Sequence, residues 1–166
     1  MELQIRRATP DESNALTAIA HAAKRHWKYP EKWIELWRPE LTITPEFIAN
    51  NEVFVAVVDG EIGGCCALVL SGSLVELEHM WIDPGQMGRG VGRALFEHIK
   101  QRARVLGLTE LELSADPNAE GFYLRMHAER IGEVPADIDG QPRVLPRMRV
   151  ELGVPPSGGS SSETAA

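Results

Sequence analysis

The sequence predicts a mixed α/β (α+β) domain in which a mostly antiparallel central sheet of six to seven strands is flanked by about four helices. Three features support this prediction. Apolar runs with strand-like alternation recur along the chain, a strong hairpin turn at Asp59-Gly60 joins two of them, and a long helix with one apolar stripe follows a glycine-rich segment.

The composition is that of a single globular domain with a polar tail. The chain has 166 residues, of which 43% are hydrophobic and 25% charged, close to the averages for compact domains. We assign residues 1–153 to the domain. Residues 154–166 are rich in Gly and Ser and have almost nothing apolar to bury, so we expect them to form a disordered tail.

The first third of the chain predicts one strand and three helices. Residues 3–5 alternate as a half-buried strand does, and Thr9-Pro10-Asp11 provides a helix start. A helix over 13–25 is indicated by apolar residues at helical spacing, namely Leu16, Ile19, Ala20 and Ala23. A short aromatic helix lies between proline breaks within 27–39, and another short helix over 45–50 begins with Thr44 as cap.

The middle of the chain predicts three consecutive strands. Residues 53–58 and 62–70 are apolar and flank the Asp59-Gly60 turn, so they form an antiparallel hairpin. A further strand over 74–82 ends at Asp83-Pro84-Gly85.

The long helix opens the last part of the chain. Its apolar stripe runs over 91–106 and stops at Gly107, a typical residue after a helix end. A strand over 111–113 follows, and Asp116-Pro117-Asn118 begins a shorter helix that reaches Met126. The last two strands are expected at 131–134 and 148–152.

Charge and composition exclude several functional classes. With 24 acidic and 17 basic residues, the formal charge of -7 disfavours general binding to nucleic acids or anionic membranes. Neither a stretch of about 20 apolar residues nor an apolar signal core at Met1–Arg6 is present, so we expect a cytosolic (cytoplasmic) protein. Cys65 and Cys66 are neighbours whose side chains point to opposite faces of a strand, so we expect no disulfide framework and no metal site.

The segment Met87–Gly92 indicates a phosphate-binding helix start. Backbone N–H groups in the first turn of a helix have no intrahelical partner, and the glycines at 88, 90 and 92 let a pyrophosphate approach them, with Arg89 adding a positive charge. A turn that merely starts a helix is the simpler alternative, although Gly92 within the helix weakens it. The spacing fits neither the Walker loop nor the full dinucleotide fingerprint, which favours coenzyme A over ATP or NAD.

At this segment the chain resembles the GNAT superfamily of acetyltransferases. The family places Arg or Gln, two residues, Gly, one residue, then Gly or Ala between a strand and a long helix, and the hairpin, Asp116-Pro117-Asn118 and Phe122-Tyr123 also match over about 3–152. Two departures are Met87, where Arg or Gln is usual, and His127-Ala128, where Gly-Phe is common. Gln86 offers a partial substitute for the first, whose main contribution is its backbone amide.

The resemblance implies a GNAT-like sheet and acetyl-CoA as acyl donor. The cofactor-binding residues that it implies are Trp81, Ile82, Met87, Gly88, Arg89, Gly90, Val91, Gly92, Asn118 and Tyr123. In this family the strand end at 81–82 presents backbone groups to the pantetheine arm, and simple core packing of these two side chains is compatible with that role. Asn118 could equally be the N-cap of the following helix.

The resemblance also implies catalytic candidates. Tyr123 matches the family's frequent general acid, and a phenol with a pKa near ~10 can protonate a departing thiolate; an ordinary core tyrosine is the alternative. Glu76 and Glu78 share one face of a strand, and either could deprotonate the acceptor through water, although a solvated strand face explains them equally well. His79 is expected on the opposite face and is the weaker candidate.

The function that follows is N-acetyl transfer from acetyl-CoA to an amine of a small-molecule acceptor by direct attack. The aromatic stretch His26–Trp37 could wall the acceptor pocket, or could simply pack a small helix. Two alternatives remain: a non-catalytic acyl-CoA-binding sensor or interaction module, and transfer to a protein or peptide amine. A homodimer is compatible with the resemblance.

Overall fold

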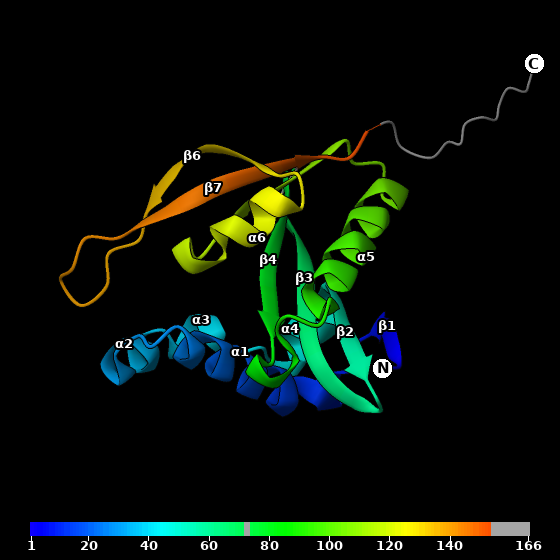
Figure 1. The fold of residues 1–166 in the computed structure, drawn as a ribbon, viewed down its shortest axis with the longest axis horizontal. Coiled ribbons are helices and arrows are strands. Elements are labelled where there is room, and N and C mark those ends of the chain that lie inside the picture. Colours follow the sequence, from blue (N-terminus) through cyan, green and yellow to red (C-terminus); the bar gives the residue numbers. More distant parts are fainter. Residues whose placement is uncertain (72–73, 154–166) are drawn as a thin grey trace, which may run out of the picture.

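In the computed structural model, which describes residues 1–71 and 74–153, a seven-stranded sheet forms the centre of the molecule (Figure 1). The sheet order is β1-β2-β3-β4-β5-β7-β6. The strands are β1 Leu3–Arg7, β2 Glu52–Val58, β3 Glu61–Ser71, β4 Leu74–Ile82, β5 Glu110–Ser114, β6 Glu129–Pro135 and β7 Val144–Glu151. Only β4 and β5 pair in parallel, so the predicted mostly antiparallel sheet is confirmed. The predicted tail, 154–166, lies outside the described residues.

The described residues form six α-helices and three 3-10 turns, against about four helices predicted. The α-helices are α1 Ser13–His26, α2 Glu31–Leu36, α3 Arg38–Leu41, α4 Pro45–Asn50, α5 Val91–Val105 and α6 Glu120–Arg125. The 3-10 turns are η1 Pro10–Glu12, η2 Pro84–Gln86 and η3 Pro117–Ala119. The helix over 45–50 was predicted and is α4, whereas the single aromatic helix expected within 27–39 is divided into α2 and α3, the second of which has Pro39 in its first turn.

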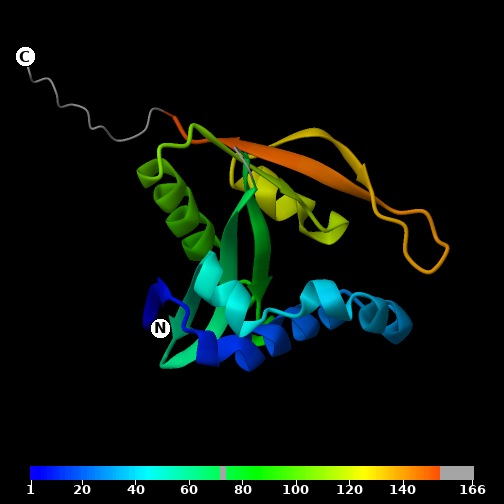
Figure 2. The same ribbon diagram turned by 180° about the vertical axis from the view of Figure 1, so that it is seen from behind.

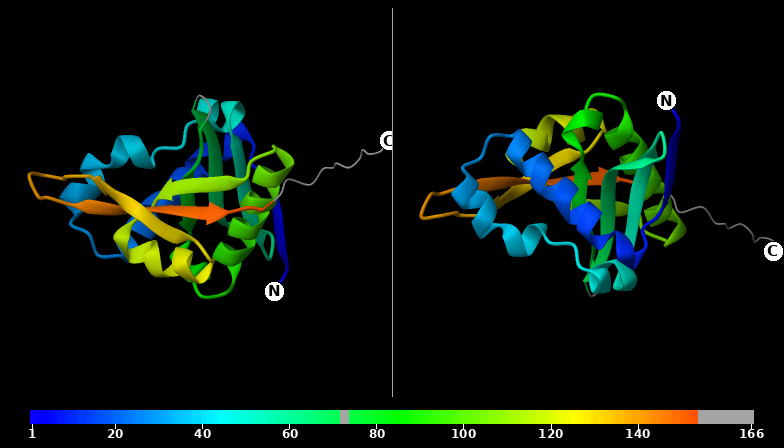
Figure 3. Two further views of the ribbon diagram at one scale, coloured as in Figure 1. Left: turned by 90° about the horizontal axis from the view of Figure 1, so that it is seen from above. Right: turned by 90° about the horizontal axis from the view of Figure 1, so that it is seen from below.

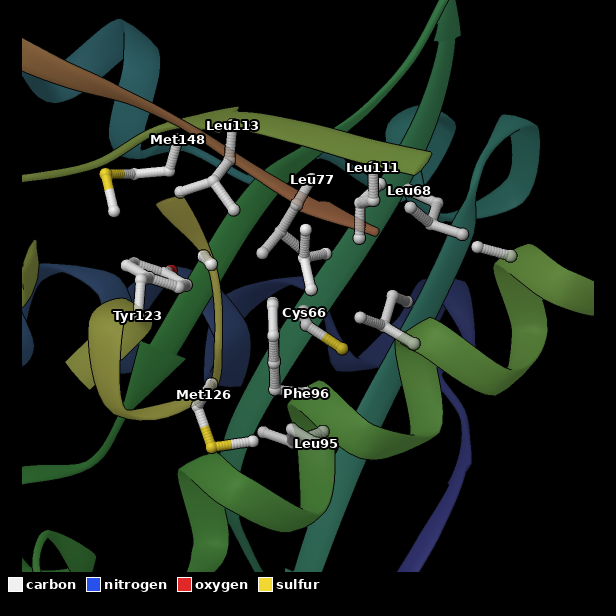
Figure 4. Close-up of a cluster of buried hydrophobic side chains, with 14 of the residues drawn as sticks. Cys66, Leu68, Leu77, Leu95, Phe96, Leu111, Leu113, Tyr123, Met126 and Met148 are labelled. Atoms are coloured by element: carbon white, nitrogen blue, oxygen red, sulfur yellow. The ribbon is translucent and has the colours of Figure 1, made fainter. Parts of the chain in front are cut away.

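The helices cover both faces of the sheet and bury two apolar layers (Figures 1 and 2). On one face α5 and α6 pack with Phe96 and Tyr123 against strand residues such as Leu68 and Leu77 (Figure 4). On the other face α1 and α4 pack with Leu16 and Ile48 against Val53, Val55, Cys65 and Ala67. Cys66 belongs to the first layer and Cys65 to the second, which confirms that these neighbours point to opposite faces.

The β6–β7 pair extends beyond the rest of the sheet, over the side where α2 and α3 lie (Figure 3). Arg143, just before β7, bonds Tyr29 in the connection between α1 and α2, so this extension is tied to the helical layer.

Burial of the thiols raises the pKa of Cys65 to about 12 and that of Cys66 well above its usual value, which leaves both as protonated core residues.

The strands β4 and β5 separate soon after they meet. Among the described residues their only register pair is Glu76 opposite Glu112, whereas β5 pairs with β7 along its whole length. Within the described part of the chain, the last residues of β4 therefore have a strand partner only on the β3 side, and an opening forms between the two strand ends. This divergence positions the candidate site.

A bulge in β4 changes which face its side chains occupy. Leu77 lies opposite Leu68 and His79 opposite Ala67, so Glu78 is an extra residue.

In the described residues no helix is long and apolar enough to cross a membrane.

Candidate active site

A pocket with a volume of about 540 Å³ lies where β4 and β5 diverge. Its walls come from the ends of both strands, the start of α5, one face of α6 and the end of α1. The volume falls within the range of small-molecule sites. The site therefore joins segments that are far apart in the chain but meet at one edge of the divergent strands.

The glycine-rich helix start forms part of the pocket wall. Met87, Gly88, Gly90 and Gly92 line it. Gly88 and Gly90 have φ angles of 77° and 86°, in the left-handed region that favours glycine, and a Cβ at either would meet no other atom within 4 Å. Because Ala94 N–H is the first to bond back, to the Gly90 carbonyl, the amides at 91–93 are free of intrahelical partners. The open backbone and free donors suit an anionic group.

Gly92 has a different role, because a Cβ there would lie 3.3 Å from Phe122 of α6. It lets α5 and α6 approach at the pocket. Two other residues of this segment that the resemblance implied are placed outside the lining. Val91 is buried in the core, and the Arg89 guanidinium donates to Gln86 Oε1 at 2.7 Å.

Two arginines that the sequence analysis did not single out, Arg93 and Arg125, do line the pocket. Arg93 follows Gly92 in the first turn of α5, and Arg125 ends α6. Both can place a positive charge near the free amides. Helix periodicity could have suggested Arg125, which shares a face with Gly121 and Phe122, but their common pocket depends on how α5 and α6 cross.

Tyr123 lies in the pocket wall, and its ring packs in the core. Tyr123 is 5% exposed, and its ring lies in the same buried cluster as Phe96 (Figure 4). The centroid of the Tyr123 ring lies 5.6 Å from that of Phe96 and 5.1 Å from that of Phe122. Among the described residues its hydroxyl has no hydrogen-bond partner, and burial raises the pKa of Tyr123 well above its usual value. The phenol is therefore held as a protonated donor beside the pocket.

The two glutamates of β4 are in different surroundings. Glu78, the bulge residue, is exposed and lines the pocket. Glu76 is not part of the lining, because it forms an ion pair with Arg147, which also bonds Glu112 at 3.0 Å. The structure therefore brings Glu78, and not Glu76, to the pocket with Tyr123.

The predicted placement of His79 is wrong. Regular alternation would place the His79 side chain on the face of the sheet that Glu76 does not occupy. The bulge at Glu78 shifts the register, so His79 lies on the same face as Glu76 and packs on Phe47 of α4. Its Nδ1 accepts a hydrogen bond of 2.9 Å from Trp81 Nε1, and burial lowers the pKa of His79 to about 4. His79 is thus a neutral residue of the core and is not part of the lining.

The end of β4 forms part of the pocket wall. Trp81 and Ile82 both line the pocket and also pack against the two apolar layers, so lining and core packing are compatible. On the β5 side, no strand of the described residues pairs with the backbone here. An extended ligand can hydrogen-bond to such an unpaired strand edge.

Asn118 lies at the pocket, although the alternative that it caps a helix is wrong. Asp116 is the cap of η3, since its carboxylate accepts the Asn118 N–H at 2.8 Å. The aromatic stretch contributes only Trp27 to the lining. The rings of Tyr29, Trp33 and Trp37 pack against one another in edge-to-face and tilted contacts, as the core-packing alternative expected.

Comparison with known proteins points to one family. Residues 49–127 match the family described as Acetyltransferase (GNAT) domain, and this range contains the end of β4, the glycine-rich helix start and Tyr123. Over these residues the chain is similar to the GNAT superfamily of N-acetyltransferases. The match confirms the resemblance drawn from the sequence, and it includes most of the GNAT pocket.

Individual GNAT relatives extend the match to most of the chain. The peptidyl-lysine N-acetyltransferase YjaB of Salmonella typhimurium is 29% identical over 133 residues, which is 69% of this chain and 87% of that protein. The crystal structure of a GCN5-related N-acetyltransferase from Rhodopseudomonas palustris superposes with a TM-score of 0.76 and 20% identity, covering 91% of this chain and 96% of that one. The PaiA N-acetyltransferase of Thermoplasma acidophilum, solved in complex with coenzyme A, superposes with a TM-score of 0.69 and 20% identity, covering 91% of this chain and 99% of that one. Both structures share the GNAT fold of this chain.

Proposed function

We propose that the protein transfers the acetyl group of acetyl-CoA to an amine of a small-molecule acceptor by direct attack, with Tyr123 as general acid. The observation that carries this proposal is the set of charged and polar groups that line one pocket. Glycines and two arginines, Arg93 and Arg125, form one part of its wall, and the Tyr123 phenol and the Glu78 carboxylate belong to the same wall. Such a pocket suits an anionic donor together with a cationic or neutral amine.

The free amides at the start of α5 would hold the pyrophosphate of acetyl-CoA. Each amide donates to a phosphate oxygen, the helix dipole favours the negative charge, and the two arginines add charge-assisted contacts. The absence of a Cβ at Gly88 and Gly90 leaves room for this approach. The unpaired edge of β4 would bind the pantetheine amides as an added strand does. The PaiA structure, which contains coenzyme A, supports this choice of donor.

Tyr123 would complete the transfer by protonating the leaving group. The amine nitrogen bonds to the thioester carbon, the carbon–sulfur bond breaks, and the phenol proton passes to the sulfur. Burial raises the pKa of Tyr123, and the same low-polarity surroundings make a thiolate more basic. Burial also raises the pKa of the Cys66 thiol, which belongs to the same apolar layer as Tyr123. Proton transfer from phenol to thiolate is therefore reasonable in this wall.

Glu78 would receive the proton that the amine loses, directly or through water. It is exposed in the bulge of β4 and lines the same pocket as Tyr123. Glu76 is the less suitable base because its carboxylate is already paired with Arg147, which also bonds Glu112. Trp27 and Trp81 add aromatic surface to the wall, which can attract a cationic acceptor.

A protein lysine is the second candidate acceptor, because the Salmonella relative is named a peptidyl-lysine N-acetyltransferase. We test the function by measuring thiol release from acetyl-CoA with panels of small amines, amino acids and lysine peptides. We expect turnover with at least one small amine. Turnover with peptides alone would assign the second acceptor class, and tight acetyl-CoA binding without turnover on any panel would favour a sensor.

Two matched arginine substitutions test the proposed pyrophosphate site. Arg93→Gln should weaken acetyl-CoA binding about tenfold, because a charge-assisted contact of roughly 1.5 kcal/mol is lost. Arg89→Gln should change it little, since Arg89 bonds Gln86 and lies outside the lining. Isothermal titration calorimetry with acetyl-CoA measures both. Weaker binding in the Arg89 variant alone would return the role to the residue that the resemblance implied.

Tyr123→Phe tests the general acid. The ring and its packing on Phe96 are kept, so the fold and the acetyl-CoA affinity should change little. The value of kcat should fall about 100-fold or more, within the usual contribution of general acids. Steady-state kinetics with the best acceptor from the panels, alongside calorimetry, separates the two effects. An unchanged kcat would remove Tyr123 from the mechanism.

Two matched substitutions in β4 test whether Glu78 is the general base. Glu78→Gln keeps the size and hydrogen bonding of the side chain but removes the base, so kcat/KM for the acceptor should fall at least tenfold. Glu76→Gln removes one partner of Arg147 away from the pocket, so its effect should appear in thermal stability, with kcat/KM little changed. The reverse order of the two activity losses would contradict this assignment.

A further inference from the structure

A group of polar side chains beside the pocket, of which Asp116 also belongs to the lining, is not used in the proposed mechanism. We call it the polar cluster: Lys24 of α1, Tyr29 between α1 and α2, Asp116 after β5, and Arg143 before β7. The Asp116 carboxylate is its centre and accepts from Lys24 Nζ at 2.8 Å and from Arg143 at 3.3 Å. The side chains of all three charged residues are only 10–12% exposed. Three distant parts of the chain thus meet on one carboxylate.

The charges of the polar cluster hold one another in place. Burial lowers the pKa of Lys24 despite the nearby carboxylate, whereas the charge and hydrogen bond of Lys24 outweigh burial and lower the pKa of Asp116. Lys24 Nζ also lies 4.0 Å from the centre of the Trp37 ring, and the Arg143 guanidinium lies 5.0 Å from it. Removing the carboxylate would leave two cations poorly solvated, so this geometry is strongly constrained.

The Tyr29 hydroxyl has all of its hydrogen-bonding capacity in use. It lies 3.0 and 3.1 Å from the two Asp116 oxygens, which only accept, so its single proton points to that carboxylate. Its oxygen then accepts from the Arg143 guanidinium at 2.7 Å and from Asn118 Nδ2 at 3.0 Å. The hydroxyl is therefore a fixed acceptor for Asn118.

This arrangement determines which way the Asn118 amide points. Nδ2 lies 3.0 Å from both the Tyr29 hydroxyl and Asp116 Oδ1, and both of these can only accept from it. A rotated amide would place its carbonyl oxygen against two acceptors, which is unfavourable. Among the described residues Asn118 Oδ1 accepts no hydrogen bond, and Asn118 itself is exposed and lines the pocket.

We propose that the polar cluster positions the Asn118 side chain, so that only its carbonyl oxygen faces the pocket and accepts a hydrogen bond from an N–H group of a bound substrate. Tyr29 and Asp116 are the positioning residues in direct contact with the Asn118 amide, and Arg143 and Lys24 act through them. The N–H group belongs either to a pantetheine amide of acetyl-CoA or to the acceptor amine. This inference rests on the proposed function for the identity of these two substrates.

A double-mutant cycle between Tyr29→Phe and Asn118→Ala tests the proposal. Tyr29→Phe removes one oxygen and keeps the ring beside Trp37. Calorimetry gives the Kd of acetyl-CoA, and thiol release gives the KM of the acceptor. Each single variant should raise one of these values about five- to tenfold, the usual effect of one lost hydrogen bond, with a smaller change in kcat. The Kd or KM of the double variant should not exceed that of Asn118→Ala, because Tyr29 acts only through Asn118.

The outcome also identifies the N–H group. A raised Kd assigns it to the pantetheine arm, and a raised acceptor KM with an unchanged Kd assigns it to the acceptor. Effects of the two substitutions that multiply in the double variant would show an ordinary structural role for Tyr29 and overturn the proposal. No change in either value for Asn118→Ala would also overturn it.

A measurement on the ligand-free protein tests the positioning even if acetyl-CoA does not bind or Tyr29→Phe does not fold. The side-chain amide protons of Asn118, assigned by their absence in Asn118→Ala, are followed by NMR. They should exchange with water at least tenfold more slowly than those of Asn14, an exposed asparagine on α1. Equal exchange rates would show that the amide is not held and would overturn the proposal. Absence of acetyl-CoA binding by a protein with a protected Asn118 would instead count against the proposed function alone.

Discussion

The separation of β4 and β5 is the constraint on which the site depends. The strands share one register pair, Glu76 opposite Glu112, and like charges at such positions repel each other unless a cation lies between them. Arg147 of β7 bonds both carboxylates and makes this contact favourable. Beyond it β5 follows β7 and β4 follows β3, so backbone groups that a continuous sheet would pair face the pocket instead. A fully paired sheet would close the space in which two substrates have to meet.

The order of elements places complementary chemistry at this opening. Because β4 and β5 run in parallel, both end at the same edge of the sheet, and each leads into a turn and a helix there. The helix after β4 brings free amides and Arg93, and the helix after β5 brings Tyr123 and Arg125. Gly92 allows the two helices to approach, since a side chain there would press on Phe122. The free amides with Arg93 and the wall that contains Tyr123 therefore meet because of one topological feature.

The bulge at Glu78 and the polar cluster refine this arrangement. The bulge lets β4 present an exposed carboxylate to the pocket while His79 and Trp81, joined by a hydrogen bond, pack toward α1 and α4. On the other side of the opening, Asp116 connects the helical layer, the segment before β7 and the pocket residue Asn118. Both features use local departures from regular structure to orient polar groups, and both lie where the sheet is already interrupted.

Local patterns in the sequence determined the strands, the long helix and the glycine-rich turn, because alternation, helical spacing and turn residues act over a few neighbours. The strand over 74–82, the end of α5 before Gly107 and the opposite faces of Cys65 and Cys66 follow from such patterns. Only the tertiary structure decided which charged side chains reach the pocket. Arg93 and not Arg89, and Glu78 and not Glu76, line it, since a bulge, a crossing of two helices and an ion pair with Arg147 depend on segments distant in the chain. The contacts of Asp116 with Lys24 and Arg143 span 92 and 27 residues, and no local pattern encodes a separation of that kind.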